Sequence, residues 1–139
     1  MTARLVFQPV VVLALWTMLV LVLMAYKRIG GGFRGRVRAS DFRMGESPSV
    51  PQDVALVNRN FMNLLEVPVL FYLACVVAVL TGQGDRIFVV AAWAFVVLRV
   101  VHTLIHVTIN RIRYRLAAFA TANFVVTFLW VRLAWALFR

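Results

Sequence analysis

Three polar residues stand one helical turn apart inside an apolar stretch of the chain. Arg59, Asn63 and Glu66 follow spacings of four and three within residues 56–80. Because positions three and four apart lie on one face of a helix, these side chains form a single stripe. A charged group at bilayer depth costs about 2.5–3.5 kcal/mol on insertion scales, so it is kept where it faces a protein interior or a wet cavity. The stripe is therefore a candidate functional site.

A second polar stripe lies in the next apolar stretch and just beyond it. Its members follow spacings of three, four, four and three, and therefore share one side of a helix: Arg99, His102, His106, Asn110 and Arg113. Glu66 has no basic residue three or four positions away, so its partner must come from another helix, another subunit or a ligand. The two stripes match in depth, and we expect Arg99 or His102 to meet Glu66 in a polar seam.

The residue types of the two stripes suit one kind of ligand. Arginine offers bidentate donors to carboxylates, and Glu66 can receive an ammonium group. Positive charge nearby also favours the thiolate form of a thiol. A small zwitterion with more than one carboxylate fits this set. Glutathione, which carries two carboxylates, an ammonium and a thiol, is such a molecule, although the residue types alone do not choose it over other anions.

Four long apolar stretches must position these residues. They cover about residues 5–25, 56–80, 87–109 and 116–138, and each is long enough to cross a hydrocarbon core of about 30 Å as a helix. A chain of 139 residues that is 63% hydrophobic and 14% charged is too apolar for a soluble domain. We predict an all-α integral membrane bundle of four helices, with residues 1–139 as a single domain.

Helix-breaking residues set the expected limits of the spans. Gly30, Gly31 and Gly32 are expected to end the first helix, which we interpret as a retained span because Lys27 follows it as a stop-transfer flank would. Pro68 is expected to kink the second span, because a proline inside a helix frees the carbonyl four residues earlier. The single cysteine, which lies in the same span, is expected to be a small buried hydrophobe.

The net charge of +10 is concentrated in the connections between the spans. Basic residues cluster in residues 26–55 and 110–115, so the positive-inside rule places both loops in the cytoplasm and both termini on the opposite side. Membrane lipids with anionic headgroups are the expected partners of these arginines, and no nucleic acid is expected. Arginine supplies nearly all of the positive charge, which is typical of GC-rich genomes and favours a bacterial inner membrane, with a microsomal membrane as the alternative.

The second-span motif resembles that of a known family. The pattern Arg59-x-x-x-Asn63-x-x-Glu66-x-Pro68, in the second of four spans, is similar to that of the MAPEG superfamily, the membrane-associated proteins in eicosanoid and glutathione metabolism. The similarity covers essentially the whole chain, including its length, the long basic first loop and the very short third loop. It implies a MAPEG-like fold that assembles as a homotrimer, with glutathione bound between neighbouring subunits near the cytoplasmic side.

The third span narrows the resemblance to one branch. Arg99-x-x-His102-Thr103, followed by Arg111 and Arg115, is most similar to the prostaglandin E synthases and microsomal glutathione transferases. The resemblance implies that Arg115 is the catalytic residue that stabilises the glutathione thiolate. Together with the stripes, it gives the predicted glutathione-binding set, in which no metal ligand is assigned: Arg28 (or its neighbour Lys27), Arg59, Asn63, Glu66, Arg99, His102, His106, Arg111 and Arg113.

Two departures from the family pattern bear on the reaction. His106 stands where family members often have a tyrosine, and Leu116 stands where the prostaglandin synthase has a serine. Both favour conjugation or peroxide reduction over prostaglandin isomerisation. The resemblance thus predicts a membrane-bound, glutathione-dependent transferase or peroxidase, which uses the thiolate of its co-substrate glutathione against a lipophilic electrophile or hydroperoxide that enters from the membrane.

Three other classes of protein are alternatives to this prediction. A non-enzymatic lipid-binding scaffold of the same superfamily keeps the fold but has no need of the glutathione constellation. A metal site built from His102, His106 and Glu66 has suitable ligand types. A proton-coupled exporter would use Glu66 as its carrier, but the surrounding arginines would repel cationic substrates.

Overall fold

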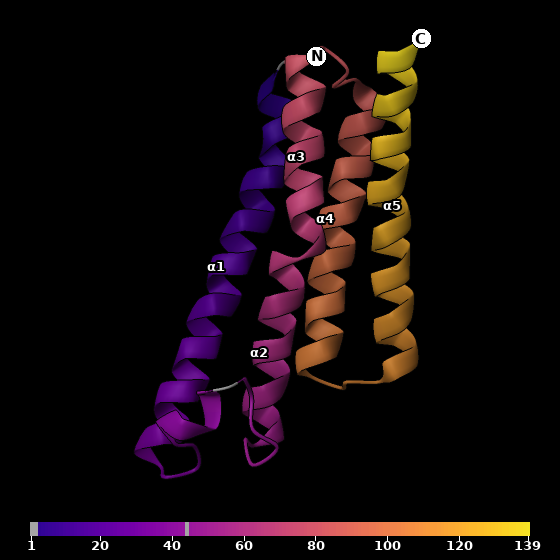
Figure 1. The fold of residues 1–139 in the computed structure, drawn as a ribbon. Coiled ribbons are helices and arrows are strands. Elements are labelled where there is room, and N and C mark those ends of the chain that lie inside the picture. Colours follow the sequence, from indigo (N-terminus) through magenta and orange to yellow (C-terminus); the bar gives the residue numbers. More distant parts are fainter. Residues whose placement is uncertain (1–2, 44) are drawn as a thin grey trace.

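The computed structural model describes residues 3–43 and 45–139 of the protein, and its regular structure there is helical (Figure 1). Taking the two halves of the second span together, four helical segments are long and apolar enough to cross a membrane, which confirms the predicted all-α membrane bundle. The elements in chain order are α1 (Ala3–Phe33), the 3₁₀ helix η1 (Ala39–Phe42), α2 (Gln52–Leu65), α3 (Val67–Leu80), α4 (Arg86–Val107) and α5 (Ile112–Phe138).

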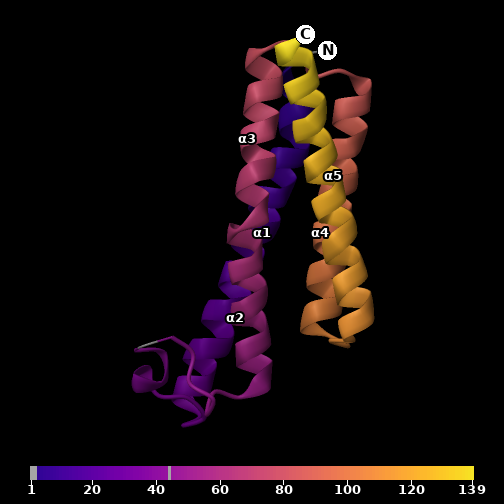
Figure 2. The same cartoon turned by 45° about the vertical axis from the view of Figure 1, so that its right-hand side comes forward.

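The spans run alternately up and down, so both termini lie at the same end of the bundle (Figures 1 and 2). We call this the terminal end, and we call the opposite end, which holds η1 and the turn between α4 and α5, the loop end. α4 packs against α1, α2 and α5 and is therefore the central helix. Toward the loop end, α2 and α5 stand apart from each other in both views.

Apolar side chains from the long helices fill the interior. Phe71 of α3 stacks on Phe95 of α4, with ring centroids 4.6 Å apart. Ala92 and Ala122 are fully buried, and such small residues let the backbones of membrane helices approach closely. Cys75 is a buried free thiol within this core, as its position in the second span predicts. The core therefore holds the terminal half of the bundle together.

The first helix does not end at its three glycines, as the sequence predicts, but continues to Phe33. Glycine in a helix interior costs about 1 kcal/mol relative to alanine, which lowers stability without breaking the helix. The chain turns out of the helix at Gly35, two residues beyond Phe33, where φ is +66° and the Arg36 N–H donates to the Gly31 carbonyl at 2.8 Å. Gly31 also lets the chain return closely, because a Cβ built there would lie 3.0 Å from Val37 Cγ2.

The second span is broken at Glu66, as the proline two residues later predicts. α2 ends at Leu65 and α3 begins at Val67, with Glu66 between them at φ −86° and ψ −92°. Pro68 then lies within the first turn of α3, where its missing N–H is not needed. The break places a carboxylate and free backbone groups at mid-span, where the bilayer offers no hydrogen-bond partner.

The connection between the first two spans is shorter than predicted, because α1 and α2 both extend into it. Its chain folds back onto the start of α2 around a small apolar cluster. This cluster consists of Val37, Val50, Val54 and Ala55, with Phe42 packed against it. The first loop is thus a packed structure, held at the loop end beside the start of α2.

Candidate functional site

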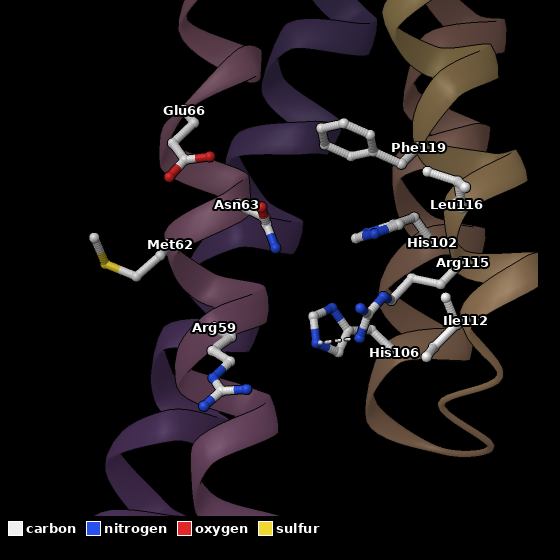
Figure 3. A pocket seen from close by; sticks show the side chains of 10 residues that line it. All are labelled: Arg59, Met62, Asn63, Glu66, His102, His106, Ile112, Arg115, Leu116 and Phe119. Atoms are coloured by element: carbon white, nitrogen blue, oxygen red, sulfur yellow. Dashed lines mark hydrogen bonds between the residues drawn. The ribbon is translucent and has the colours of Figure 1, made fainter. Parts of the chain in front are cut away.

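A cavity of about 480 Å³ opens between α2 and the α4–α5 pair, toward the loop end (Figure 3). One wall comes from α2 and the break that follows it, and the other from α4 and the first turns of α5. Six of the ten predicted site residues line it. The full lining is Arg59, Met62, Asn63, Glu66, His102, His106, Ile112, Arg115, Leu116 and Phe119.

The α2 wall carries the stripe that the sequence predicts. Arg59, Asn63 and Glu66 follow one another along this wall (Figure 3). The Arg59 side chain is 69% exposed, and its Nε lies 3.5 Å from Oε1 of Glu46 in the first loop. Glu66 is exposed, and among the described residues its carboxylate makes no ion pair. Both charged groups are therefore available to a ligand.

The expected pairing of Glu66 with Arg99 or His102 is not formed. Glu66 is exposed and lines the cavity, whereas Arg99 is fully buried. Arg99 Nη2 instead donates to the main-chain carbonyl of Asn63 at 3.2 Å. The Asn63 carbonyl lies beside the break. It belongs to the residue before Leu64, and the proline was expected to free the Leu64 carbonyl. The guanidinium therefore compensates for the broken helix.

Arg99 supports the cavity from behind and does not line it. It is fully buried, and its guanidinium carbon lies 5.5 Å from the centroid of the Phe95 ring and 5.4 Å from that of Phe119. Arginine packs well against aromatic faces because the ring quadrupole attracts the cation. Phe119 lines the cavity, so Arg99 touches both a backbone group and a side chain of the walls.

The α4–α5 wall carries two buried histidines and one arginine. The rings of His102 and His106 meet edge to face, with centroids 5.5 Å apart. Arg115 Nη1 donates to Asn110 Oδ1 at 2.8 Å and lies 3.5 Å from His106 Nε2. Because arginine has only donors, Nε2 is the acceptor in this second contact.

The turn between α4 and α5 places Arg115. Asn110 has φ +43°, a left-handed conformation that asparagine tolerates, and its N–H donates to the Ile105 carbonyl at 2.8 Å. α5 begins at Ile112, four residues earlier than predicted, so Arg115 lies in its first turn. The Asn110 side chain then holds the guanidinium at the mouth of the cavity.

Three further predicted residues lie away from the cavity lining. Arg28 donates from Nη2 to Asn58 Oδ1 at 2.8 Å and stacks over the Phe42 ring at 4.3 Å. Arg111 and Arg113 are exposed at the turn between α4 and α5. The structure therefore brings the two stripes together but leaves Arg28 and these two turn arginines at the loop end outside the main cavity.

Some residues of the site were not predicted from the sequence. Met62, Ile112 and Phe119 add apolar surface to the cavity, and only their position on the same helical faces could have indicated this. Asn60 is fully buried, and neither its side-chain oxygen nor its nitrogen has a partner among the described residues. It follows Arg59 directly, so its burial marks the face of α2 that turns toward the bundle interior.

The cavity continues toward the loop end in a second hollow of about 350 Å³. The two share Arg59, Ile112 and Arg115, and the second adds the polar side chains of Gln52 and Asn110. A ligand with an apolar part and a charged part can therefore lie with its charged groups between the two arginines.

The structure gives the metal alternative no support. Across residues 3–43 and 45–139, no group of three or more His, Cys, Asp or Glu side chains lies close enough to hold a metal ion. Glu66 stands on the α2 wall of the cavity, whereas His102 and His106 stand on the α4 wall (Figure 3).

Comparison with known proteins gives one match. The model of a family described as the MAPEG family matches residues 6–135. No curated protein and no solved structure matches the chain. The matched segment includes every residue that lines the cavity.

Proposed function

Because the chain belongs to the MAPEG family, we propose that it is a membrane-bound, glutathione-dependent transferase or peroxidase. Membership makes it an integral membrane protein related to glutathione and eicosanoid metabolism. The proposed activity goes beyond family membership, and it rests on one observation. One arginine and one amide of α2, and the carboxylate at the break that follows it, face two histidines and Arg115 across a single cavity.

The donor set of the cavity fits glutathione. The guanidinium groups of Arg59 and Arg115 suit its two carboxylates, and the exposed carboxylate of Glu66 suits its ammonium group. Asn63 offers an amide between them. The volume of about 480 Å³ also falls within the range of about 300–1,000 Å³ that small-molecule sites occupy.

Arg115 is the proposed catalytic residue. A guanidinium beside the sulfur stabilises the thiolate over the thiol, and the thiolate is the nucleophile. Arg115 is already held by Asn110, so little reorganisation is needed when the negative charge forms. The proton leaves the thiol to solvent through the open loop end.

Two reactions are open to this thiolate. In conjugation, its electron pair forms a carbon–sulfur bond and the leaving group departs with its own pair. In peroxide reduction, the sulfur attacks the peroxide oxygen, the oxygen–oxygen bond breaks, and an alcohol and a glutathione sulfenic acid form. A second glutathione then yields glutathione disulfide and water. Both reactions use glutathione as the only reductant or nucleophile.

The apolar lining supports a lipophilic co-substrate. Met62, Ile112 and Leu116 are exposed large hydrophobics that line the cavity between α2 and α5. In a bilayer such side chains contact lipid or a neighbouring subunit. We propose that the electrophile or hydroperoxide enters from the membrane through this side.

The proposed orientation in the membrane follows from the charge at the two ends of the bundle. The loop end carries the basic first loop and the arginines at the turn between α4 and α5, so we place it, with the cavity, in the cytoplasm. The proposal includes one four-span domain over residues 1–139, a homotrimer, and a bacterial inner membrane. The exposed apolar faces of α2 and α5 at the cavity supply the surface for a neighbouring subunit.

Glutathione binding to the purified protein in detergent, measured by calorimetry, tests the proposal. We expect saturable binding with proton release, abolished by Glu66→Gln and by Arg59→Ala. Arg86→Gln, an exposed charge at the terminal end, is the matched control and should bind as the wild type does. If folded wild-type protein fails to bind glutathione at millimolar concentration, the transferase proposal is wrong and the lipid-binding scaffold becomes the better one.

A further inference from the structure

A carboxylate from the first loop reaches Arg59, at the loop end of the cavity. Glu46 Oε1 lies 3.5 Å from Arg59 Nε. The Glu46 side chain is only 13% exposed, whereas that of Arg59 is 69% exposed, so the carboxylate is the fixed partner and the arginine the movable one. We propose that Glu46 is a positioning residue that orients Arg59 for ligand binding. This inference rests on the proposed glutathione site.

Glu46 is held in place by a chain of hydrogen bonds. Asn58 Nδ2 donates to Glu46 Oε2 at 2.9 Å, and Asn58 Oδ1 accepts from Arg28 Nη2 at 2.8 Å. Arg28 in turn stacks over the Phe42 ring in η1. The chain links the end of α1, the first loop and α2. It also gives Arg28 a role at the site that requires no contact with the ligand.

The geometry indicates that Glu46 positions Arg59 and does not compete with the ligand for it. A guanidinium presents five N–H donors in a fixed plane and can serve two carboxylates on different edges. Glu46 contacts Arg59 through Nε, which leaves the edge formed by the two terminal nitrogens for the cavity. Both carboxylates can therefore bind Arg59 at once.

Removing the loop carboxylate should weaken binding because Arg59 would then be ordered only when the ligand arrives. Immobilising a long side chain at that moment reduces affinity by about two- to tenfold. Because the Arg59 side chain is 69% exposed, its ion pair with Glu46 contributes little to stability, and the fold should not change. The expected signature is a loss of affinity without a loss of thermal stability.

The first test compares Glu46→Gln with wild type by glutathione calorimetry. Glutamine keeps the size of the side chain and an oxygen for Asn58 but removes the charge. We expect the Kd to rise about two- to tenfold. The matched control is Asp53→Asn, which removes a carboxylate paired with Lys27 and Arg36 beside the same loop and should leave the Kd unchanged. An equal loss in both variants, no change in Glu46→Gln, or tighter binding by it would overturn the inference.

The second test does not depend on glutathione. In protein labelled with ¹⁵N-arginine, the Arg59 Nε–H resonance is identified by its absence in Arg59→Gln. We expect this resonance to shift and its hydrogen exchange to accelerate in Glu46→Gln but not in Asp53→Asn. An unchanged resonance in Glu46→Gln would overturn the inference. If wild-type protein fails to bind glutathione while this resonance responds, the proposed function is wrong and the positioning of Arg59 stands.

Discussion

At the scale of the residue, the site separates side chains that line the cavity from side chains that hold its walls. Arg59, Glu66 and Arg115 present charges to the cavity, whereas Arg99 is buried behind it and bonded to the Asn63 carbonyl. All four are charged residues at or near bilayer depth, where they are retained only for a purpose. Their positions indicate two roles: Arg59, Glu66 and Arg115 face the cavity, whereas Arg99 supports its wall.

Arg99→Met should destabilise the fold because it removes the donor to the Asn63 carbonyl and leaves that group unpaired beside the break. A hydrogen bond to a charged group contributes about 1.5–3 kcal/mol, and we expect a loss of that order in denaturant unfolding in detergent. Arg86→Met, which alters an exposed residue, should unfold as the wild type does. Normal stability combined with lost glutathione binding would instead place Arg99 among the ligand contacts, as the sequence predicts.

Arg115→Gln should impair the chemical step more than binding. Removing one donor from a developing anion typically reduces kcat by about 10²–10³-fold. We expect the ultraviolet absorbance of the bound thiolate to disappear, while glutathione still binds through the α2 wall. The measurement is thiolate absorbance and turnover of a general lipophilic electrophile, with Arg86→Gln as the control. A variant that keeps the thiolate absorbance would exclude this role for Arg115.

Much of the site could be predicted because helical periodicity fixes which residues share a face. The spacing of Arg59, Asn63 and Glu66 and of the two histidines brought five predicted residues to one cavity, and the family resemblance added Arg115. Periodicity does not describe how a chain leaves a helix. It therefore did not predict that Arg99 would bond to the Asn63 carbonyl beside the break. The loop fold that brings Glu46 to Arg59 likewise depends on tertiary packing with no local pattern.

At the scale of the element, the break in the second span and the turn between α4 and α5 define the cavity. Pro68 predicted the break, since a proline has one clear effect inside a helix. The three glycines gave a misleading signal, because glycine permits other conformations but does not impose them. The chain instead turns out of α1 at Gly35, where a left-handed residue was needed.

Pro68→Ala should restore a continuous helix and displace Glu66 from the cavity. The substitution returns a main-chain N–H that can donate to the Leu64 carbonyl, so the second span should straighten. Misplacement of a binding group by about 1 Å can cost about 10²-fold in rate, and we expect kcat/KM to fall by that order. Thermal stability in detergent should be kept or raised. Wild-type kcat/KM in this variant would show that the break does not position Glu66.

At the scale of the whole molecule, the two ends of the bundle differ in charge and in the functional residues that they hold. The loop end holds the cavity and the basic connections, while the terminal end holds both chain ends and the short turn before α4. Four spans require both termini to lie on one side of the membrane. The exposed hydrophobic side chains along the spans suit contact with lipid or with other subunits.

The orientation can be measured with reporter fusions in a bacterial host. We expect a C-terminal alkaline phosphatase fusion to be active and a C-terminal green fluorescent protein fusion to be dark, because the proposed orientation keeps the basic loop end in the cytoplasm. Fusions to a chain truncated in the first loop should give the opposite pattern. A fluorescent full-length fusion would reverse the orientation and place the cavity outside the cytoplasm.

The burial of Cys75 has a consequence for the proposed reaction of a thiol with an electrophile or a hydroperoxide. A protein that generates a thiolate risks mixed disulfides with its own cysteines, and one that receives hydroperoxides risks their oxidation. Here the lone thiol is fully enclosed by the core of α3 and its neighbours, on the far side of the break from the cavity. Its burial thus protects the Cys75 thiol from both of the proposed substrates.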